Sequence, residues 1–235
     1  MSNPQVAISI SFHRQWNIRL PYVYRYLEKE YVDNFFEKGI IRLSSFENFS
    51  KHSDEHRLDS EEGRGVFINA TREPKPQTVI AGISYGRNAY VLCGSTIYKN
   101  EMSRDFRTNS GFRINDTTGF AEAISRYLPG CVGGIEGLCT YLDKRTSYRT
   151  TRALDIQNRD GHGIDIQKTM GEIFQRAGDD FLFMKHSSYS SQNEYRIIWA
   201  VPNNVSGYID VVCLEAVKFC TRFEDMHSES ESKKE

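Results

Sequence analysis

Residues 192–201 read Gln-Asn-Glu-Tyr-Arg-Ile-Ile-Trp-Ala-Val, and this stretch decides how we interpret the fold. From Tyr195 onward it is nearly continuous in apolar, β-branched and aromatic residues, which is typical of a buried strand. A loop rich in hydroxyl groups, residues 187–191, precedes it. Because strand side chains alternate between two faces, we expect Gln192 and Glu194 to share one face at the mouth of this strand. A polar strand end that faces water is the alternative interpretation.

The bulk properties predict an ordinary globular protein. The chain has 235 residues, of which 39% are hydrophobic and 26% charged, and its net charge is −1. This length suits one large domain or two small ones. The near-zero charge gives no general attraction for nucleic acid, although it leaves room for a local basic groove. We expect an N-terminal extension over residues 1–21, a single catalytic domain over 22–223 and a disordered tail over 224–235.

The cysteines and the apolar runs indicate the compartment. Five cysteines occur, and none forms a Cys-x-x-Cys pair. This pattern predicts free thiols in a reducing environment and no metal site. Residues 1–17 lack the basic start and apolar core of a signal peptide, and no run of about 18 apolar residues follows. We therefore expect a cytoplasmic protein that does not contact a membrane.

Strands outnumber helices in the remaining pattern. Expected helices cover residues 28–38, with Gly39 as the C-terminal cap, a segment capped by Thr117 or Thr118 that runs to Tyr127, and residues 164–177. Expected strands cover residues 22–27, 40–43, 79–85, 89–97, 112–115, 181–185, 195–201 and 208–214. A turn at residues 86–88 joins the third and fourth of these strands. The pattern predicts an α+β domain with a bent, mostly antiparallel core.

Three separate segments of the chain could meet in one cleft. They are Arg25 in the first strand, Ser95-Thr96 at the end of the strand over 89–97, and Gln192-x-Glu194. Their order resembles the Arg…Ser-Thr…Gln-x-Glu layout of mono-ADP-ribosyltransferases. The opening, a strand and a helix followed by Gly39 and a second strand, is similar to the start of that fold.

The chain also resembles a bacterial family recognised by two blocks of sequence. The first block is the same opening followed by an acidic loop. The second is a late lysine, here Lys185, a short loop and Glu-Tyr-Arg-Ile, here residues 194–197. The resemblance covers roughly half of the chain, and residues 103–178 match neither pattern.

The resemblance implies an enzyme that transfers ADP-ribose from NAD. Glu194 would stabilise the positive charge that develops on the ribose as its bond to nicotinamide breaks. Arg25 would hold the anionic diphosphate or the ribose, and Ser95 would orient Glu194. The remaining residues assigned to NAD binding are Tyr24, Ser44 and Thr96. The usual third serine is absent, because Ile97 follows Thr96, and His13 is an alternative to Arg25.

The nature of the acceptor follows from Gln192. Gln-x-Glu enzymes of the resembled family modify amides or nucleobases, whereas Glu-x-Glu enzymes modify arginine. We therefore expect a base in RNA or DNA and, second, a protein side chain, with Tyr189 stacking on the acceptor. A basic and aromatic stretch fits a single nucleic-acid strand, with a solvated loop as the alternative. Its residues are Tyr141, Arg145, Tyr148, Arg149 and Arg152. The expected biological role is a toxin or anti-phage effector, neutralised by an antitoxin protein.

Two other classes of function stay open. One is a metal-dependent nuclease that binds magnesium through the acidic loop over residues 54–62. Its carboxylates are Asp54, Glu55, Asp59, Glu61 and Glu62, and His52 and His56 lie beside them. The other is a non-catalytic binding module. No phosphate-binding Gly-x-x-x-x-Gly-Lys loop and no Gly-x-Ser-x-Gly elbow occur, which disfavours ATP-driven enzymes and serine hydrolases.

Overall fold

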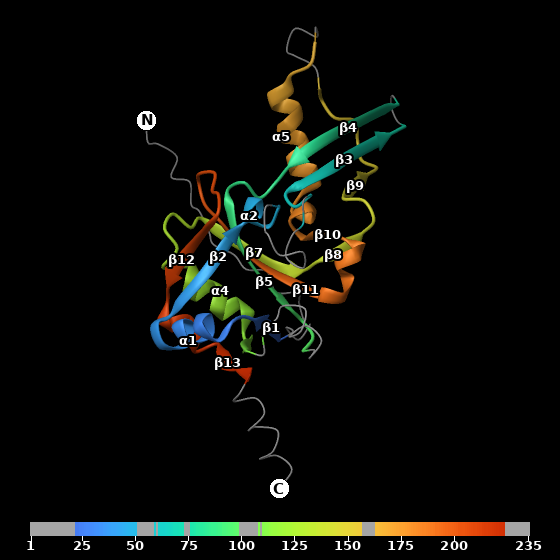
Figure 1. Ribbon diagram of the computed structural model, residues 1–235. Helices are drawn as coiled ribbons and strands as arrows, with labels where there is room; N and C mark the ends of the chain where they lie inside the picture. The colour runs from blue at the N-terminus through green and yellow to red at the C-terminus, as the bar shows by residue number, and fades with distance from the viewer. Residues whose placement is uncertain are drawn as a thin grey trace, which may run out of the picture.

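The computed structural model describes residues 22–50, 59, 61–72, 76–98, 108, 110–156 and 163–223. Within them it shows a mostly antiparallel sheet with few helices (Figure 1), which confirms the α+β class. The predicted extension and tail, together with His13, His52, Asp54, Glu55 and His56, lie outside the described residues. Nowhere in the described part of the chain is a helix both long and apolar enough to cross a membrane.

Strand β11 (Glu194–Ala200) confirms the strand predicted from residue 195 onward, and it lies inside the main sheet. It pairs antiparallel with β5 (Ala89–Ser95) on one side and with β7 (Gly133–Leu138) on the other. All of its residues except Ala200 are buried. The Trp199 indole is fully buried, and its Nε1 donates to the Ala121 carbonyl at 3.0 Å.

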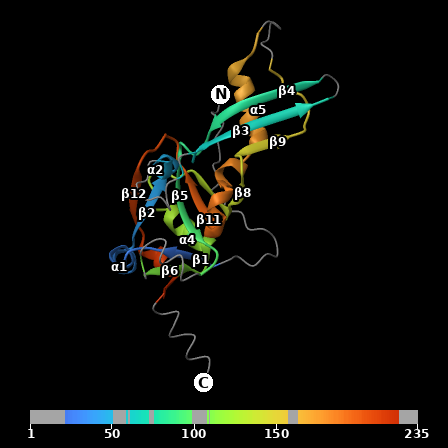
Figure 2. The same ribbon diagram turned by 45° about the vertical axis from the view of Figure 1, so that its right-hand side comes forward.

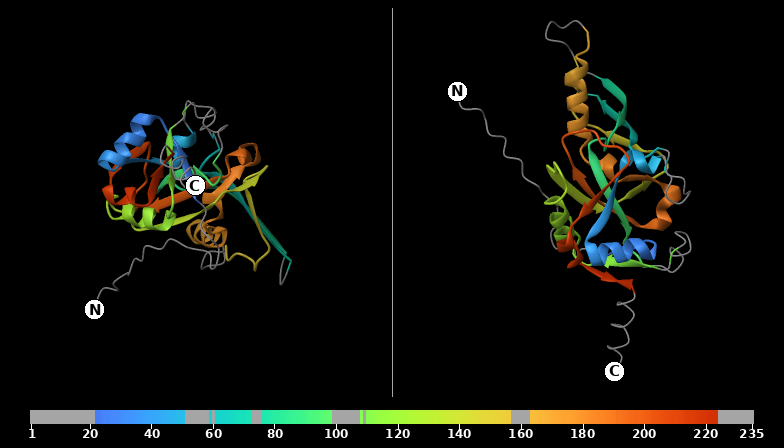
Figure 3. Two further views of the ribbon diagram at one scale, coloured as in Figure 1. Left: turned by 90° about the horizontal axis from the view of Figure 1, so that it is seen from below. Right: turned by 60° about the vertical axis from the view of Figure 1, so that its left-hand side comes forward.

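Helices α1 (Lys29–Lys38), α4 (Thr117–Ser125) and α6 (Leu214–Val217) pack on the main sheet. They lie toward the opposite end of the molecule from α5 (Ile166–Ala177), as Figures 1 and 3 show. Gly39 caps α1 in the left-handed region at φ 71°, as predicted. The predicted cap of α4 was wrong. Asp116, and neither threonine, accepts from the Gly119 amide, because a carboxylate is the stronger acceptor at that turn.

A small lobe projects from the main sheet (Figure 2). It consists of β3 (Arg64–Thr71), β4 (Gln77–Ser84), β9 (Thr146–Arg149) and α5, around a core that includes Phe67, Ile83 and Ile173. The turn predicted at residues 86–88 separates β4 from β5, and the Ala89 amide donates to the Gly86 carbonyl at 3.2 Å. β4 pairs with β3, which was not predicted, whereas β5 belongs to the main sheet.

The remaining elements are short. They are α2 (Phe46–Ser50), β6 (Gly111–Ile114), β8 (Thr140–Leu142), β10 (Met184–His186), β12 (Tyr208–Val212), β13 (Cys220–Arg222) and two 3-10 turns, η1 (Asp180–Phe183) and η2 (Ser187–Gln192). Most of the predicted strand over residues 181–185 is therefore the turn η1. Only its end forms β10, which pairs parallel with β8.

The main sheet divides along one edge of β5. Strand β2 (Ile40–Ser45) pairs with the start of β5, where Ser44 lies opposite Val91. Strand β1 (Val23–Tyr26) pairs with its end, where Tyr24 lies opposite Ser95. Residues 92–94 of β5 therefore lie between two strands that both leave the same edge. Gly94 permits this close approach, because a Cβ there would collide with Val23 Cγ1 and lie 3.0 Å from the Tyr24 carbonyl oxygen.

Replacing Gly94 by alanine is expected to destabilise the protein by about 1–3 kcal/mol, since β1 must shift away from β5 to make room for the methyl group. Urea unfolding followed by circular dichroism measures this change. Gly133→Ala in β7 is the matched control, because a Cβ at Gly133 meets no atom within 4 Å. Equal unfolding midpoints for the two variants would show that the contact between β1 and Gly94 is not tight.

Candidate functional site

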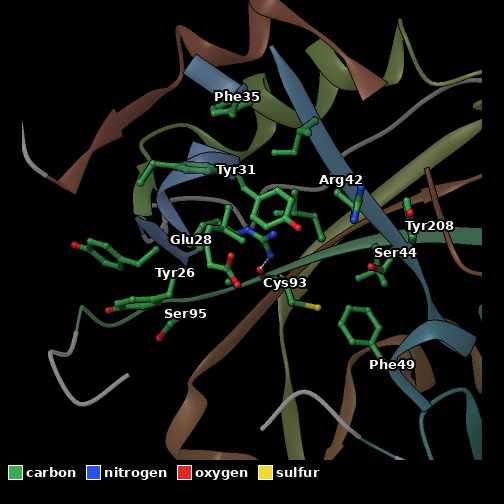
Figure 4. A pocket seen from close by; sticks show the side chains of 18 of the residues that line it. Tyr26, Glu28, Tyr31, Phe35, Arg42, Ser44, Phe49, Cys93, Ser95 and Tyr208 are labelled. Atoms are coloured by element: carbon green, nitrogen blue, oxygen red, sulfur yellow. Dashed lines mark hydrogen bonds between the residues drawn. The ribbon is translucent and has the colours of Figure 1, made fainter. Parts of the chain in front are cut away.

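A cavity of about 790 Å³ opens where β1 and β2 diverge from β5. Its walls come from β1, α1, β2 and β5, together with Lys185, Gln192 and Glu194. In Figure 4, Tyr26 and Glu28 lie on one side of it and Arg42 and Ser44 on the other, with Cys93 between them. Its volume lies within the range of small-molecule binding sites.

Most of the residues predicted for the site line this one cavity. They are Tyr24, Arg25, Ser44, Ser95, Gln192 and Glu194. Thr96 and Tyr189 are not among the lining residues. Thr96 instead holds the adjacent chain, because its amide and its Oγ1 both donate to the Asn193 carbonyl, at 2.9 and 3.2 Å.

The side chain of Arg25 lies at the division of the sheet. Its Nη1 donates to the carbonyl of Cys93, which is midway between the β5 residues that pair with β2 and β1. One part of the guanidinium thus holds the backbone of β5, and the same side chain lines the cavity. This contact places a positive charge in the cavity, beside the middle of β5.

Gln192 and Glu194 converge for a different reason from the one predicted. Gln192 ends the turn η2, and Asn193 adopts the left-handed conformation at φ 45° before β11 begins. Strand alternation therefore does not apply to Gln192. Asparagine is among the few non-glycine residues that tolerate this conformation, which is the sequence signal for the turn. The prediction of a shared strand face was wrong, although both side chains reach the cavity.

Lys185 connects these two side chains. Its Nζ donates to Gln192 Oε1 at 2.8 Å and to Glu194 Oε2, and it lies 5.0 Å from the centre of the Tyr189 ring. Strand β10 places it opposite Tyr141 of β8, whose hydroxyl accepts from the Glu194 amide at 2.7 Å. Tyr189 therefore lies next to the site without lining the cavity.

Behind the cavity, Glu194 belongs to a chain of six buried charges. Arg196 Nε donates to Glu194 Oε1 at 2.6 Å, and its two Nη atoms donate to the carboxylate of Glu62 at 3.0 and 2.9 Å. Arg145 pairs with Asp59 and lies 4.0 Å from Glu62. In order, the buried charge chain is Lys185, Glu194, Arg196, Glu62, Arg145 and Asp59. None of these residues is more than 8% exposed, and their formal charges cancel.

The buried charge chain keeps Glu194 ionised. Burial disfavours the charged carboxylate, but the charges of Lys185 and Arg196 outweigh it and hold the pKa of Glu194 well below its usual range. Burial likewise opposes the charge of Lys185, and Glu194 outweighs it, so that the pKa of Lys185 lies above its usual range. At neutral pH Glu194 is therefore a carboxylate that can stabilise a cation and not a general acid.

The depressed pKa predicts how stability depends on pH. The pKa of Glu194 is lower in the folded state than the 4.5 of the unfolded chain, so its contribution is complete above that value and is lost as the pH falls through the folded pKa. We expect the free energy of unfolding to fall below about pH 4.5 in the wild type, and more gently in Glu194→Gln. Urea titrations at several pH values measure both slopes. If the free energy of unfolding fell equally steeply with decreasing pH in both proteins, the lowered pKa of Glu194 would be contradicted.

The described residues of the acidic loop and of the basic stretch have partners within the fold, while most of the acidic loop lies outside the described residues. Asp59 and Glu62 of the acidic loop face arginines in the buried charge chain, and the described residues contain no cluster of three candidate metal ligands. The basic stretch predicted to bind nucleic acid is not one surface. Arg145 is buried, and Arg149 pairs with Asp180, because their charges are used to join segments of the fold.

The five cysteines are all free thiols, as predicted. Cys93 lines the cavity, and Cys139 Sγ lies 3.5 Å from Glu194 Oε1. Burial, reinforced by the charge of Glu194, raises the pKa of both thiols. They are therefore packing groups beside the carboxylate and not nucleophiles.

No protein-family model, curated protein or solved structure matches this chain. The function must therefore be argued from the geometry of the cavity. That geometry consists of a carboxylate between two buried cations, an arginine that lines the same cavity, and an amide and an ammonium beside the carboxylate.

Proposed function

We propose that this protein is a mono-ADP-ribosyltransferase, which uses NAD as its substrate and modifies a base in RNA or DNA or, second, a protein side chain. One observation carries the proposal. Arg25 and Glu194, which are far apart in the sequence, line the same cavity where the main sheet divides. A dinucleotide with an anionic centre and a reactive ribose needs a cation and a carboxylate in such an arrangement.

The cavity walls suit the other parts of a dinucleotide. Tyr24, Tyr26 and Tyr31 contribute aromatic rings to the lining, which can pack against a base or a nicotinamide ring. Ser44 contributes a hydroxyl group from the end of β2. The Ser95 hydroxyl instead donates to the Ile97 carbonyl at 2.9 Å and accepts from the Ile97 amide, so it stabilises its own turn and not the predicted contact with Glu194. Arg25 supplies the positive charge that a diphosphate requires.

The proposed chemistry is a substitution at the ribose carbon that carries nicotinamide. The bond from this carbon to the ring nitrogen breaks, and its electron pair leaves with nicotinamide as the neutral base. The positive charge that develops on the ribose is stabilised by the carboxylate of Glu194, which is desolvated and therefore acts at low dielectric. A lone pair of the acceptor forms the new bond, and the acceptor releases its proton to solvent.

The acceptor would approach from the side of the turn η2. Gln192 ends this turn and lines the cavity next to Glu194, and Tyr189 lies within the same turn near Lys185. An amide and an aromatic ring in that place suit a planar acceptor such as a nucleobase. The chain would then act as a toxin or anti-phage effector, which requires a neutralising antitoxin in the cell that makes it.

Labelled NAD tests this proposal. The protein is incubated with NAD that carries its label in the adenylate phosphate, in separate reactions with RNA, DNA and cell-extract protein. We expect label in one pool and release of free nicotinamide, with the rates of both reduced about 10²-fold in Glu194→Asp. A second reaction with label in the nicotinamide ring must leave the acceptor unlabelled. No label in any pool and no nicotinamide release would contradict the proposal.

A further inference from the structure

Lys185 is a buried lysine on the wall of the cavity, and the proposed chemistry does not by itself require it. It is 8% exposed and comes from β10, whose parallel pairing with β8 places it opposite Tyr141. The Tyr141 hydroxyl also accepts a hydrogen bond from the Glu194 amide. The pair of strands β8 and β10 therefore holds both Lys185 and Glu194 in place. Its position is therefore set by the fold and not by a flexible loop.

The Lys185 ammonium determines how the Gln192 amide is oriented. An ammonium carries only donors, so it must meet the carbonyl oxygen of a glutamine and not its nitrogen. The 2.8 Å contact from Nζ is accordingly to Gln192 Oε1. A glutamine can otherwise present either end of its amide, and the two ends recognise opposite kinds of partner.

Glu194 has a second buried cation besides Lys185. Oε1 of Glu194 accepts a hydrogen bond from Arg196 Nε at 2.6 Å. Arg196 in turn donates two hydrogen bonds to the carboxylate of Glu62. Without Lys185 the carboxylate would keep this buried cation. Gln192 Oε1 would lose the donor that selects the carbonyl end of its amide.

We propose that Lys185 is a positioning residue, which orients Gln192 toward the acceptor and thereby directs ADP-ribose to the acceptor instead of to water. This inference rests on the proposed function. Transfer and hydrolysis break the same bond between ribose and nicotinamide, and they differ in which lone pair forms the new bond to the ribose carbon. Water needs no oriented amide, whereas an acceptor must be held within reach of that carbon.

The test is the fraction of cleaved NAD that ends on the acceptor. Lys185→Met keeps a side chain of similar length and removes the donors. Because Lys185 also contacts Glu194, nicotinamide release can change as well, so the diagnostic quantity is the ratio of transfer to release. We expect this transferred fraction to fall at least about tenfold, since a misplaced acceptor loses much of its rate. Release is measured by chromatography of nicotinamide, and transfer by acceptor-bound label.

A double-mutant cycle shows whether Lys185 acts through Gln192. Gln192→Ala leaves the pair between Lys185 and Glu194 in place and should lower the transferred fraction by itself. The double variant Lys185→Met with Gln192→Ala should then match Gln192→Ala alone, because the two residues act as a unit. Should Lys185→Met fail to fold, an unchanged transferred fraction in Gln192→Ala would still overturn the inference.

The outcomes separate the inference from the proposed function. Equal loss of release and transfer in Lys185→Met, with the transferred fraction unchanged, would show a purely structural lysine and overturn the inference alone. A wild-type protein that releases no nicotinamide with any acceptor pool would overturn the proposed function, and the inference with it.

Discussion

Glu194→Gln is expected to release nicotinamide from NAD about 10³-fold more slowly than the wild type, because it removes the charge that stabilises the developing ribose cation. Because Gln and Glu have nearly the same shape, the loss of rate reports the removal of the negative charge and not a change in side-chain size. The measurement is the initial rate of nicotinamide release at saturating NAD, normalised to the folded fraction of each protein.

Two further variants make this result interpretable. Glu194→Gln leaves Lys185 and Arg196 with one anion fewer, so part of its effect can come from the fold. Glu194→Asp keeps the charge and withdraws it by one methylene group, and we expect a loss of about 10²-fold from misplacement. Glu122→Gln on the exposed face of α4 is the matched control and should retain the wild-type rate. Wild-type rates in both Glu194 variants would exclude the proposed chemistry.

Arg196→Met is expected to lower the free energy of unfolding by about 3–5 kcal/mol, the usual cost of removing one partner from a buried ion pair. Arg196 is 2% exposed and contacts Glu194, Glu62 and the Leu182 carbonyl. Methionine fills much of the space, but it leaves two buried carboxylates without their common cation. Urea unfolding at neutral pH measures the loss.

Arg126→Met is the matched control for that measurement. Arg126 pairs with Glu215 at 2.9 Å, but the two side chains are 60% and 35% exposed. Exposed pairs of this kind contribute about 0–1 kcal/mol. If Arg196→Met lost no more stability than Arg126→Met, the buried charge chain would not be important for the fold.

Local patterns were enough to predict several elements. The apolar run of β11 and the helical spacing before Gly39 both express short-range rules, and the structure confirms them. The pairing of β4 with β3 was not predicted, because it depends on contacts outside the local pattern. A short turn at residues 86–88 favours a hairpin locally, but β3 and the lobe core provide β4 with a better partner.

In the candidate site, too, contacts between distant segments could not be predicted from local patterns. Arg25 and Glu194 were chosen from their order in the sequence, and the cavity brings them together. Arg196 and Glu62 were missed as members of the site, because in the sequence a charged residue looks the same whether it faces water or another charge. Lys185 appeared only within a resembled block, with no signal of its contact to Gln192.

The amino-acid sequence by itself determined the α+β class, the apolar strand β11 and the cap of α1 at Gly39, since these depend on side-chain type and near neighbours. Only the tertiary structure decided that β1 and β2 leave the same edge of β5, and that Glu194 is held between Lys185 and Arg196. The reason is physical. Both features depend on which distant segments pair, and that choice depends on the free energy of the whole core.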